Sequence, residues 1–121
     1  MRDCSLVVVL RGDLRLDLDT LVIHACHAGL GTLEDITGFE LDAWQEHQYS
    51  TVVLECTGED ALVRMESLAL GVGLSCFLVR DARRRAVALG LGPGMDLWRV
   101  TGRLQVWQRG DDASDDPVVV H

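Results

Sequence analysis

The chain has 121 residues, 48% of them hydrophobic, which predicts one domain with a hydrophobic core and excludes a disordered chain. Its net charge is −8, and all eleven basic residues are arginines because the sequence contains no lysine. This acidic balance argues against non-specific binding of nucleic acid, so a contact with RNA requires a local cluster of arginines.

In the first half of the chain, one strand-like segment is followed by two helix-like segments. Residues 6–10 form a continuous apolar run, which is typical of a strand buried on both faces. Residues 13–19 alternate apolar and acidic side chains and fit a half-exposed strand or an extended loop. A helix is predicted over residues 21–32, with Asp19 or Thr20 as its N-cap, and a second over residues 40–48 after the break at Thr37-Gly38.

The second half contains more strands. The β-branched alternation predicts a strand over residues 50–56, and apolar spacing predicts a helix over residues 59–70. Two further strands are expected at 74–79 and 86–91. Gly92-Pro93-Gly94 should break the chain before a short helix at 95–100, and residues 104–107 fit either a last strand or a helix end.

This order of elements indicates an α/β fold with three layers, in which a mixed four-stranded sheet carries helices on both faces. We expect one domain over residues 1–109. Residues 110–121 carry four aspartates and a proline, and this acidic tail is predicted to be disordered or loosely docked. A domain of this size is also compatible with a homodimer.

Location and cofactors follow from what the sequence lacks. No apolar run approaches the ~18 residues of a membrane-spanning helix, and the first residues do not resemble a signal peptide. Four cysteines include no CxxC pair and are expected to be buried in a reducing compartment. We therefore predict a cytoplasmic protein with no membrane partner, no metal and no cofactor.

Two histidines form the first group of candidate functional residues. His24 and His27 lie three residues apart, so a helix presents them on one face. They lack the spacing and the glutamate of a zinc-protease motif, and no acidic ligand follows at the required spacing on the same helix. The alternatives are an enzyme site for a small molecule on this face, or a His27 that packs against the sheet and bonds a backbone carbonyl.

An arginine-rich segment between two predicted strands forms the second group. Residues 80–85 read Arg-Asp-Ala-Arg-Arg-Arg. The surrounding positive charge keeps Asp81 ionised, and arginines in a short loop can grip phosphates. The segment is therefore either a phosphate-binding patch or a solvated charged hairpin turn.

Five segments, in order, resemble the type 2 peptidyl-tRNA hydrolase family. Arg11-Gly12-Asp13-Leu14 is similar to the family's Arg-Lys-Asp-Leu motif, and residues 20–31 are similar to its first helix. Residues 52–54 correspond to its next hydrophobic strand, and residues 73–82 resemble its Gly-Leu strand ending in Arg-Asp-Ala. Residues 91–93 and 100–102 resemble its closing Gly-Pro and Val-Thr-Gly, so the resemblance covers residues 6–106.

The resemblance implies a function and a set of site residues. The family hydrolyses the ester that joins a peptide to tRNA. Asp81 stands at its catalytic aspartate, where it would orient the water, and His27 stands at its first-helix histidine. The implied substrate-binding residues are Arg80, Arg83, Arg85, His24 and Asp13, with tRNA held by the arginines of residues 80–85.

The sequence also departs from the family pattern. The family's first-helix lysine falls on Thr20 and its glutamine on His24, while the segment before the helix is acidic. The loop after Asp81 is shortened and lacks the family threonine, and residues 25–28 resemble a divergent branch of the family. These departures support an alternative: a catalytically inactive family member that binds RNA, a nucleotide or a protein.

Overall fold

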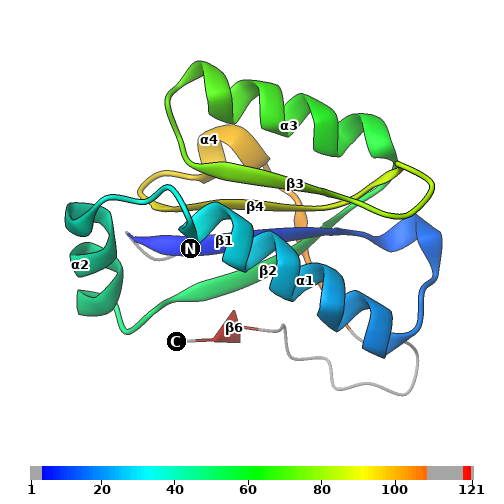
Figure 1. Cartoon of the computed structure of the whole chain (residues 1–121), viewed down its shortest axis with the longest axis horizontal. Coiled ribbons are helices and arrows are strands. Elements are labelled where there is room, and N and C mark those ends of the chain that lie inside the picture. Colours follow the sequence, from blue (N-terminus) through cyan, green and yellow to red (C-terminus); the bar gives the residue numbers. More distant parts are fainter. Residues whose placement is uncertain (1–3, 109–118, 121) are drawn as a thin grey trace.

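The computed structural model describes residues 4–108 and the backbone of residues 119–120. Figure 1 shows one sheet with helices on both of its faces. The elements, in chain order, are β1 (Ser5–Arg11), the 3-10 turn η1 (Gly12–Leu14), α1 (Leu18–Leu33), α2 (Gly38–Glu46), β2 (Thr51–Cys56), α3 (Glu59–Gly71), β3 (Cys76–Arg80), β4 (Ala86–Gly94), α4 (Trp98–Thr101), β5 (Gln105–Val106) and β6 (Val119–Val120).

The sheet is mixed, as predicted, with the strand order β3-β4-β1-β2-β5 and with β6 also paired to β2. Strands β1 and β2 run parallel, and the remaining pairs are antiparallel. The α/β class is therefore confirmed. The count of four strands was wrong, because β5 and β6 are two residues long and too short to carry a hydrophobic period.

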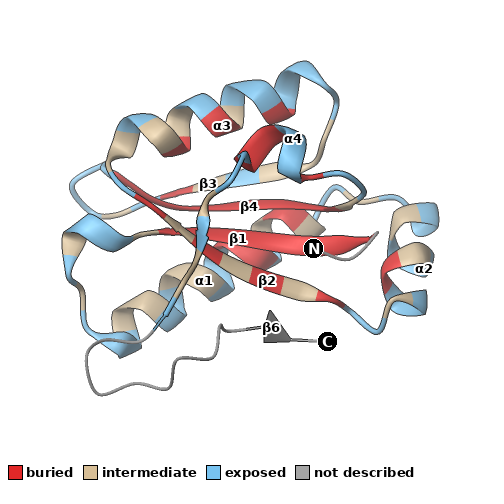
Figure 2. Ribbon diagram, turned by 180° about the vertical axis from the view of Figure 1, so that it is seen from behind, coloured by how far each residue is buried: buried red, intermediate tan, exposed pale blue. Residues whose placement is uncertain are grey.

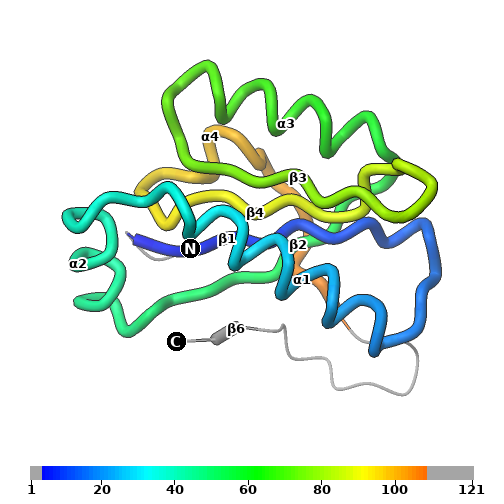
Figure 3. The backbone as a smooth tube through the Cα atoms, viewed as in Figure 1, coloured from blue at the N-terminus to red at the C-terminus, as the bar shows by residue number. Residues whose placement is uncertain are grey.

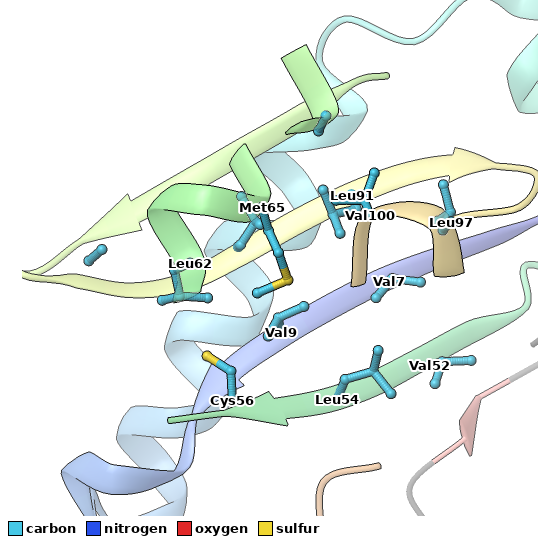
Figure 4. Packing of buried hydrophobic residues seen from close by; sticks show 13 residues of the cluster. Val7, Val9, Val52, Leu54, Cys56, Leu62, Met65, Leu91, Leu97 and Val100 are labelled. Atoms are coloured by element: carbon cyan, nitrogen blue, oxygen red, sulfur yellow. The ribbon is translucent and has the colours of Figure 1, made fainter. Parts of the chain in front are cut away.

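Two of the apolar clusters hold α3 and α1 against opposite faces of the sheet. Val7 and Val9 of β1 point toward Leu62 and Met65 of α3, as Figure 4 shows. The alternate β1 residues Val8 and Leu10 pack on the opposite face, beneath α1. Strand β1 is thus buried on both faces, as its continuous apolar sequence predicts, and Figure 2 shows it and β4 as the most buried strands.

The starts of both early helices differ from the prediction. Helix α1 begins at Leu18 because Asp17, and not Asp19 or Thr20, is the N-cap: its Oδ1 accepts from the Thr20 backbone N–H at 2.8 Å. Helix α2 begins at Gly38 because Thr37 and Glu40 form a capping box. Residues 37–38, expected to break the chain, therefore start a helix.

Strand β4 continues through the predicted break and ends at Gly94. Its pairing with β1 shifts register between the partners of Ser5 and Val7, and Pro93 lies opposite this shift. A bulge tolerates proline because no regular ladder hydrogen bond is required there. The helix after it, α4, is accordingly shorter than expected and spans only Trp98–Thr101.

Most of the predicted acidic tail, residues 110–118 and 121, lies outside the described residues. Val119 and Val120 pair with β2. Within the described part of the chain no helix is long and apolar enough to cross a membrane. All four cysteines are free, but the expectation that they are buried holds only for Cys4 and Cys56, since Cys26 is exposed.

Candidate functional site

The candidate residues gather at one end of the sheet. Strand β1 ends there, α3 begins there, and the hairpin between β3 and β4 turns there, as the backbone trace in Figure 3 makes clear. Side chains connect these segments: Arg11 donates through Nη1 to the Ala86 carbonyl at 3.1 Å, and Glu59 accepts from the Ala86 backbone N–H.

Asp81 organises the hairpin. Its Oδ1 accepts from the backbone N–H groups of Arg83 and Arg85, both at 2.9 Å. Its Oδ2 accepts from Nε of Arg85 at 2.8 Å and forms an ion pair with Nη2 at the same distance. The segment that sequence alone left open between a phosphate patch and a hairpin turn is thus a hairpin whose turn is built around one carboxylate.

These contacts also set the proton affinity of Asp81. The hydrogen bond from the Arg85 backbone is the first of several influences that lower the pKa of this carboxyl below its ordinary value. A carboxylate held by four donors has little basicity left. Asp81 therefore supplies a fixed negative charge at the site more readily than it accepts a proton.

The four arginines of the hairpin differ in how far their charge is compensated. Arg85 is paired with Asp81, and Arg80 donates to the Arg84 carbonyl at 3.0 Å and lies 3.8 Å from a Glu59 carboxylate oxygen. The guanidinium groups of Arg83 and Arg84 are exposed and have no hydrogen-bond or ion-pair partner among the described residues. Their positive charge is therefore the part of the hairpin open to an anion.

Sequence reasoning missed one member of this site and did not single out another. Arg84 lies within the predicted patch of residues 80–85 but was not named individually as a substrate-binding residue, and its φ of 64° places it at the turn. Glu59 was missed because it lies 27 residues from its partner Ala86, and no local pattern indicates that contact.

Asp13 is held by a separate set of contacts beside the hairpin. It accepts from Nε and Nη2 of Arg11 at 3.2 and 2.7 Å, and from the backbone N–H of Gly58 at 2.9 Å. The hydrogen bond from Arg11 is the main reason that the pKa of Asp13 falls to about 2. The carboxylate of Asp13 thus joins η1 to the turn before α3. The role of Asp13 in substrate binding stays a prediction.

The Asp13 contacts predict an acid-dependent loss of stability. The folded-state pKa of about 2 lies below the ordinary 3.8, so the stabilisation is complete above pH 3.8 and is lost as pH falls toward 2. We expect Asp13→Asn to lower the free energy of unfolding at pH 7 by about 1 kcal/mol, a value reduced for solvent screening. Urea denaturation of both proteins should show the difference shrinking between pH 4 and pH 2.

Asp42→Asn is the matched control, because Asp42 is exposed on α2 and makes no hydrogen bond or ion pair within the described residues. It should leave the free energy of unfolding unchanged at either pH. A deficit for Asp13→Asn that is equally large at pH 2 and pH 7 would contradict the role given to the Asp13 charge.

His27 and His24 both lie on α1 but in different environments. His27 is exposed and lines a cavity of about 340 Å³ together with Arg80, Phe77 and Glu34. It makes no hydrogen bond to a carbonyl in the described part of the chain, so the alternative of a packed and bonded His27 was wrong.

His24 is partly buried, and its Nδ1 is inaccessible and has no hydrogen-bond partner among the described residues. Burial lowers its pKa from the ordinary value, the Asp81 charge opposes that change, and His27 adds to it. The ring is therefore neutral near pH 7 and lies within the electrostatic reach of Asp81. The structure thus brings together the predicted residues of the helix and of the hairpin.

In residues 4–108, no three histidine, cysteine or acidic side chains are grouped closely enough to hold a metal ion. The Cys56 thiol lines the same pocket as Asp13, and burial raises its pKa to about 11. This thiol stays protonated at neutral pH and is a poor nucleophile. The groups available for chemistry at this end of the sheet are therefore carboxylate, imidazole and guanidinium.

Comparison with known proteins gives one consistent result. The family model described as peptidyl-tRNA hydrolase PTH2 matches residues 4–107. A peptidyl-tRNA hydrolase of Methanopyrus kandleri is 35% identical over 108 residues, covering 81% of this chain and 93% of the relative. The mitochondrial peptidyl-tRNA hydrolase 2 of Bos taurus is 29% identical over 114 residues, covering 85% of this chain and 64% of the relative. The chain belongs to the peptidyl-tRNA hydrolase PTH2 family.

Proposed function

We propose that this protein is a peptidyl-tRNA hydrolase, which cleaves the ester bond between a peptide and the terminal ribose of tRNA. Family membership over residues 4–107 and relatives that carry this name support the proposal. The observation that carries it is the meeting of the Asp81 hairpin with the histidine face of α1. There, a fixed negative charge, neutral imidazole and uncompensated arginines lie together.

The arginines of the hairpin are the proposed contact for tRNA. On a chain with a net charge of −8, phosphate binding depends on a local positive surface. Arg83 and Arg84 supply it, since Arg85 and Arg80 are partly compensated by Asp81 and Glu59. Guanidinium groups bind phosphate with two parallel hydrogen bonds, which suits a site that must position one end of a large RNA.

The cavity beside His27 is the proposed place for the end of the substrate. Its volume of about 340 Å³ is at the lower end of the range for small-molecule sites. Its polar lining comes from His27, Glu34 and Arg80, and its apolar lining comes from Leu30, Phe77, Leu78 and Val79. We propose that His27 contacts the substrate there, while Asp81 provides the charge that the reaction requires.

Loss of the two free guanidinium groups should weaken substrate binding. We expect Arg83→Ala/Arg84→Ala to raise KM for peptidyl-tRNA about tenfold while kcat changes little, because phosphate contacts act in the ground state and the transition state alike. The slope of log(kcat/KM) against the logarithm of the salt concentration should also become less steep, by the amount expected for the loss of up to about two phosphate contacts. Steady-state kinetics over a range of salt concentration measures both effects.

Arg64→Ala is the control for a general loss of charge, since Arg64 is exposed on α3 and has no partner among the described residues. The proposed contact would be wrong if both proteins had the same KM and the same salt dependence as the unmodified chain.

The direct test of the function is release of tRNA from labelled peptidyl-tRNA by the purified protein. Turnover beyond one equivalent is expected, and no release at high protein concentration would overturn the proposal. We place the reaction in the cytoplasm, which the four free cysteines favour. A homodimer stays a prediction that sedimentation can test.

A further inference from the structure

An apolar groove lies between the end of α3 and helix α4, at the end of the sheet opposite to the β3–β4 hairpin (Figure 2). Its cavity measures about 350 Å³, and the buried residues Leu97 and Val100 line part of it. Three large apolar side chains in its lining are exposed: Leu68 by 47%, Val72 by 72% and Met95 by 60%. These three belong to no apolar cluster of the core, so the fold does not account for them.

Trp98 extends this apolar surface beyond the groove. Its side chain is 56% exposed, and the guanidinium carbon of Arg99, a groove residue, lies 5.7 Å from the centre of its ring. Tryptophan and arginine are the residues that most often dominate the binding energy of protein interfaces. We name Leu68, Val72, Met95 and Trp98 the α3–α4 patch. From their exposed fractions, these side chains present roughly 450 Å² of surface, a size typical of functional patches on soluble proteins.

Two opposite charges flank the α3–α4 patch. Asp96 and Arg99 both line the groove and are exposed, and neither forms an ion pair within residues 4–108. They lie on either side of Trp98 in the chain. A two-fold axis near Trp98 would therefore place Arg99 of a second copy against Asp96 of the first, and the reverse pair would form by symmetry. The surface is complementary to itself in both apolar area and charge.

The size of the patch also fits a second copy. Symmetry buries the patch twice, and the roughly 900 Å² of apolar surface and the charged rim together reach the ~1,200 Å² at which specific protein interfaces begin. A different protein would satisfy both charges only if it carried an arginine and an acidic residue in the opposite order. A second copy of this chain supplies that order without further requirement.

We propose that the α3–α4 patch is a homodimer interface, in which two copies pack around a two-fold axis near Trp98. Asp96 of each copy pairs with Arg99 of the other, and the apolar side chains of the patch close over the groove. The β3–β4 hairpin lies at the other end of the sheet (Figure 1), so both candidate sites stay open to substrate in the dimer. The inference does not depend on the proposed function.

Sedimentation velocity of the full chain tests the interface over protein concentrations from about 1 to 100 μM. We expect the mass to rise from one copy to two, with a dissociation constant on the order of 10 μM for an interface of this small size. Trp98→Ala should raise the dissociation constant at least about tenfold. Phe39→Ala is the matched control, because Phe39 is 80% exposed on α2 and lies outside the patch, and it should leave the dissociation constant unchanged.

Reversal of the two charges tests the symmetry of the dimer. Asp96→Arg and Arg99→Asp each place like charges in both predicted contacts, so each variant alone should raise the dissociation constant at least about tenfold. An equimolar mixture of the two variants should dimerise, because a copy with two arginines then faces a copy with two aspartates. Formation of this mixed dimer also shows that both variants are folded.

Three results would overturn the inference. The first is an unmodified protein that sediments as one copy up to 100 μM. The second is a dimer whose dissociation constant Trp98→Ala and both charge reversals leave unchanged. The third is a loss of the dimer that is as large in Phe39→Ala as in Trp98→Ala, which would place the interface elsewhere on the surface.

Discussion

Gly90→Ala is expected to lower the free energy of unfolding by about 3 kcal/mol, at the upper end of the usual cost of overpacking. Gly90 lies in β4 where α1 crosses the sheet, and an added Cβ would lie 2.1 Å from the Ala28 carbonyl oxygen. The Ala28 carbonyl belongs to the backbone of α1 and cannot rotate away as a side chain can. The whole helix must therefore move away from the strand. Urea denaturation measures the change in free energy.

Two other glycines of the chain provide graded controls. A Cβ at Gly38 meets no heavy atom within 4 Å, so Gly38→Ala should change stability by less than about 0.5 kcal/mol or slightly increase it. A Cβ at Gly31 meets the ring of Phe77, which is 41% exposed and has room to turn away. Gly31→Ala should therefore cost less than Gly90→Ala, and equal costs for all three would contradict the close approach of α1 to β4.

Asp81→Ala should reduce kcat/KM for peptidyl-tRNA by at least about 100-fold, the range found when a preorganised charge is removed from an active site. The variant loses the acceptor for the Arg83 and Arg85 backbone N–H groups and the ion pair with the Arg85 guanidinium. It also removes the charge that acts on His24. Stability should change little, because the hairpin is exposed to water, which can replace the lost hydrogen bonds.

Asp81→Asn distinguishes the two roles of the carboxylate. Its amide oxygen can still accept from the two backbone N–H groups, so the turn should keep its shape, while the negative charge is gone. Activity near that of Asp81→Ala would assign the effect to charge, whereas activity near that of the unmodified protein would assign it to the shape of the hairpin. Full activity in both variants would remove Asp81 from the site.

Patterns that are local in the chain could be interpreted from the sequence. The apolar run of β1 indicated a doubly buried strand, and the three-residue spacing of His24 and His27 placed both on one face of α1. The contacts of Asp81 reach only two to four residues along the chain, so its ionised state beside arginines was predictable from the segment itself.

Contacts between distant residues left no such signal. Arg11 and Ala86 are 75 residues apart, yet their hydrogen bond joins the end of β1 to the hairpin. Glu59 reaches Ala86 and compensates Arg80, and nothing near Glu59 in the sequence indicates this. The N-cap of α1 was misplaced for a different reason: Asp17 and Asp19 are equally good caps by residue type, and only the hydrogen bond to Thr20 distinguishes them.

The central claim is that this end of the sheet is an active site despite its departures from the family pattern. The most direct measurement is the single-turnover rate of tRNA release from labelled peptidyl-tRNA, with the protein in excess and with Asp81→Ala measured in parallel. We predict complete release by the unmodified protein and a rate at least about 100-fold lower for the variant. Equal rates for the two proteins, or no release by either, would contradict the claim.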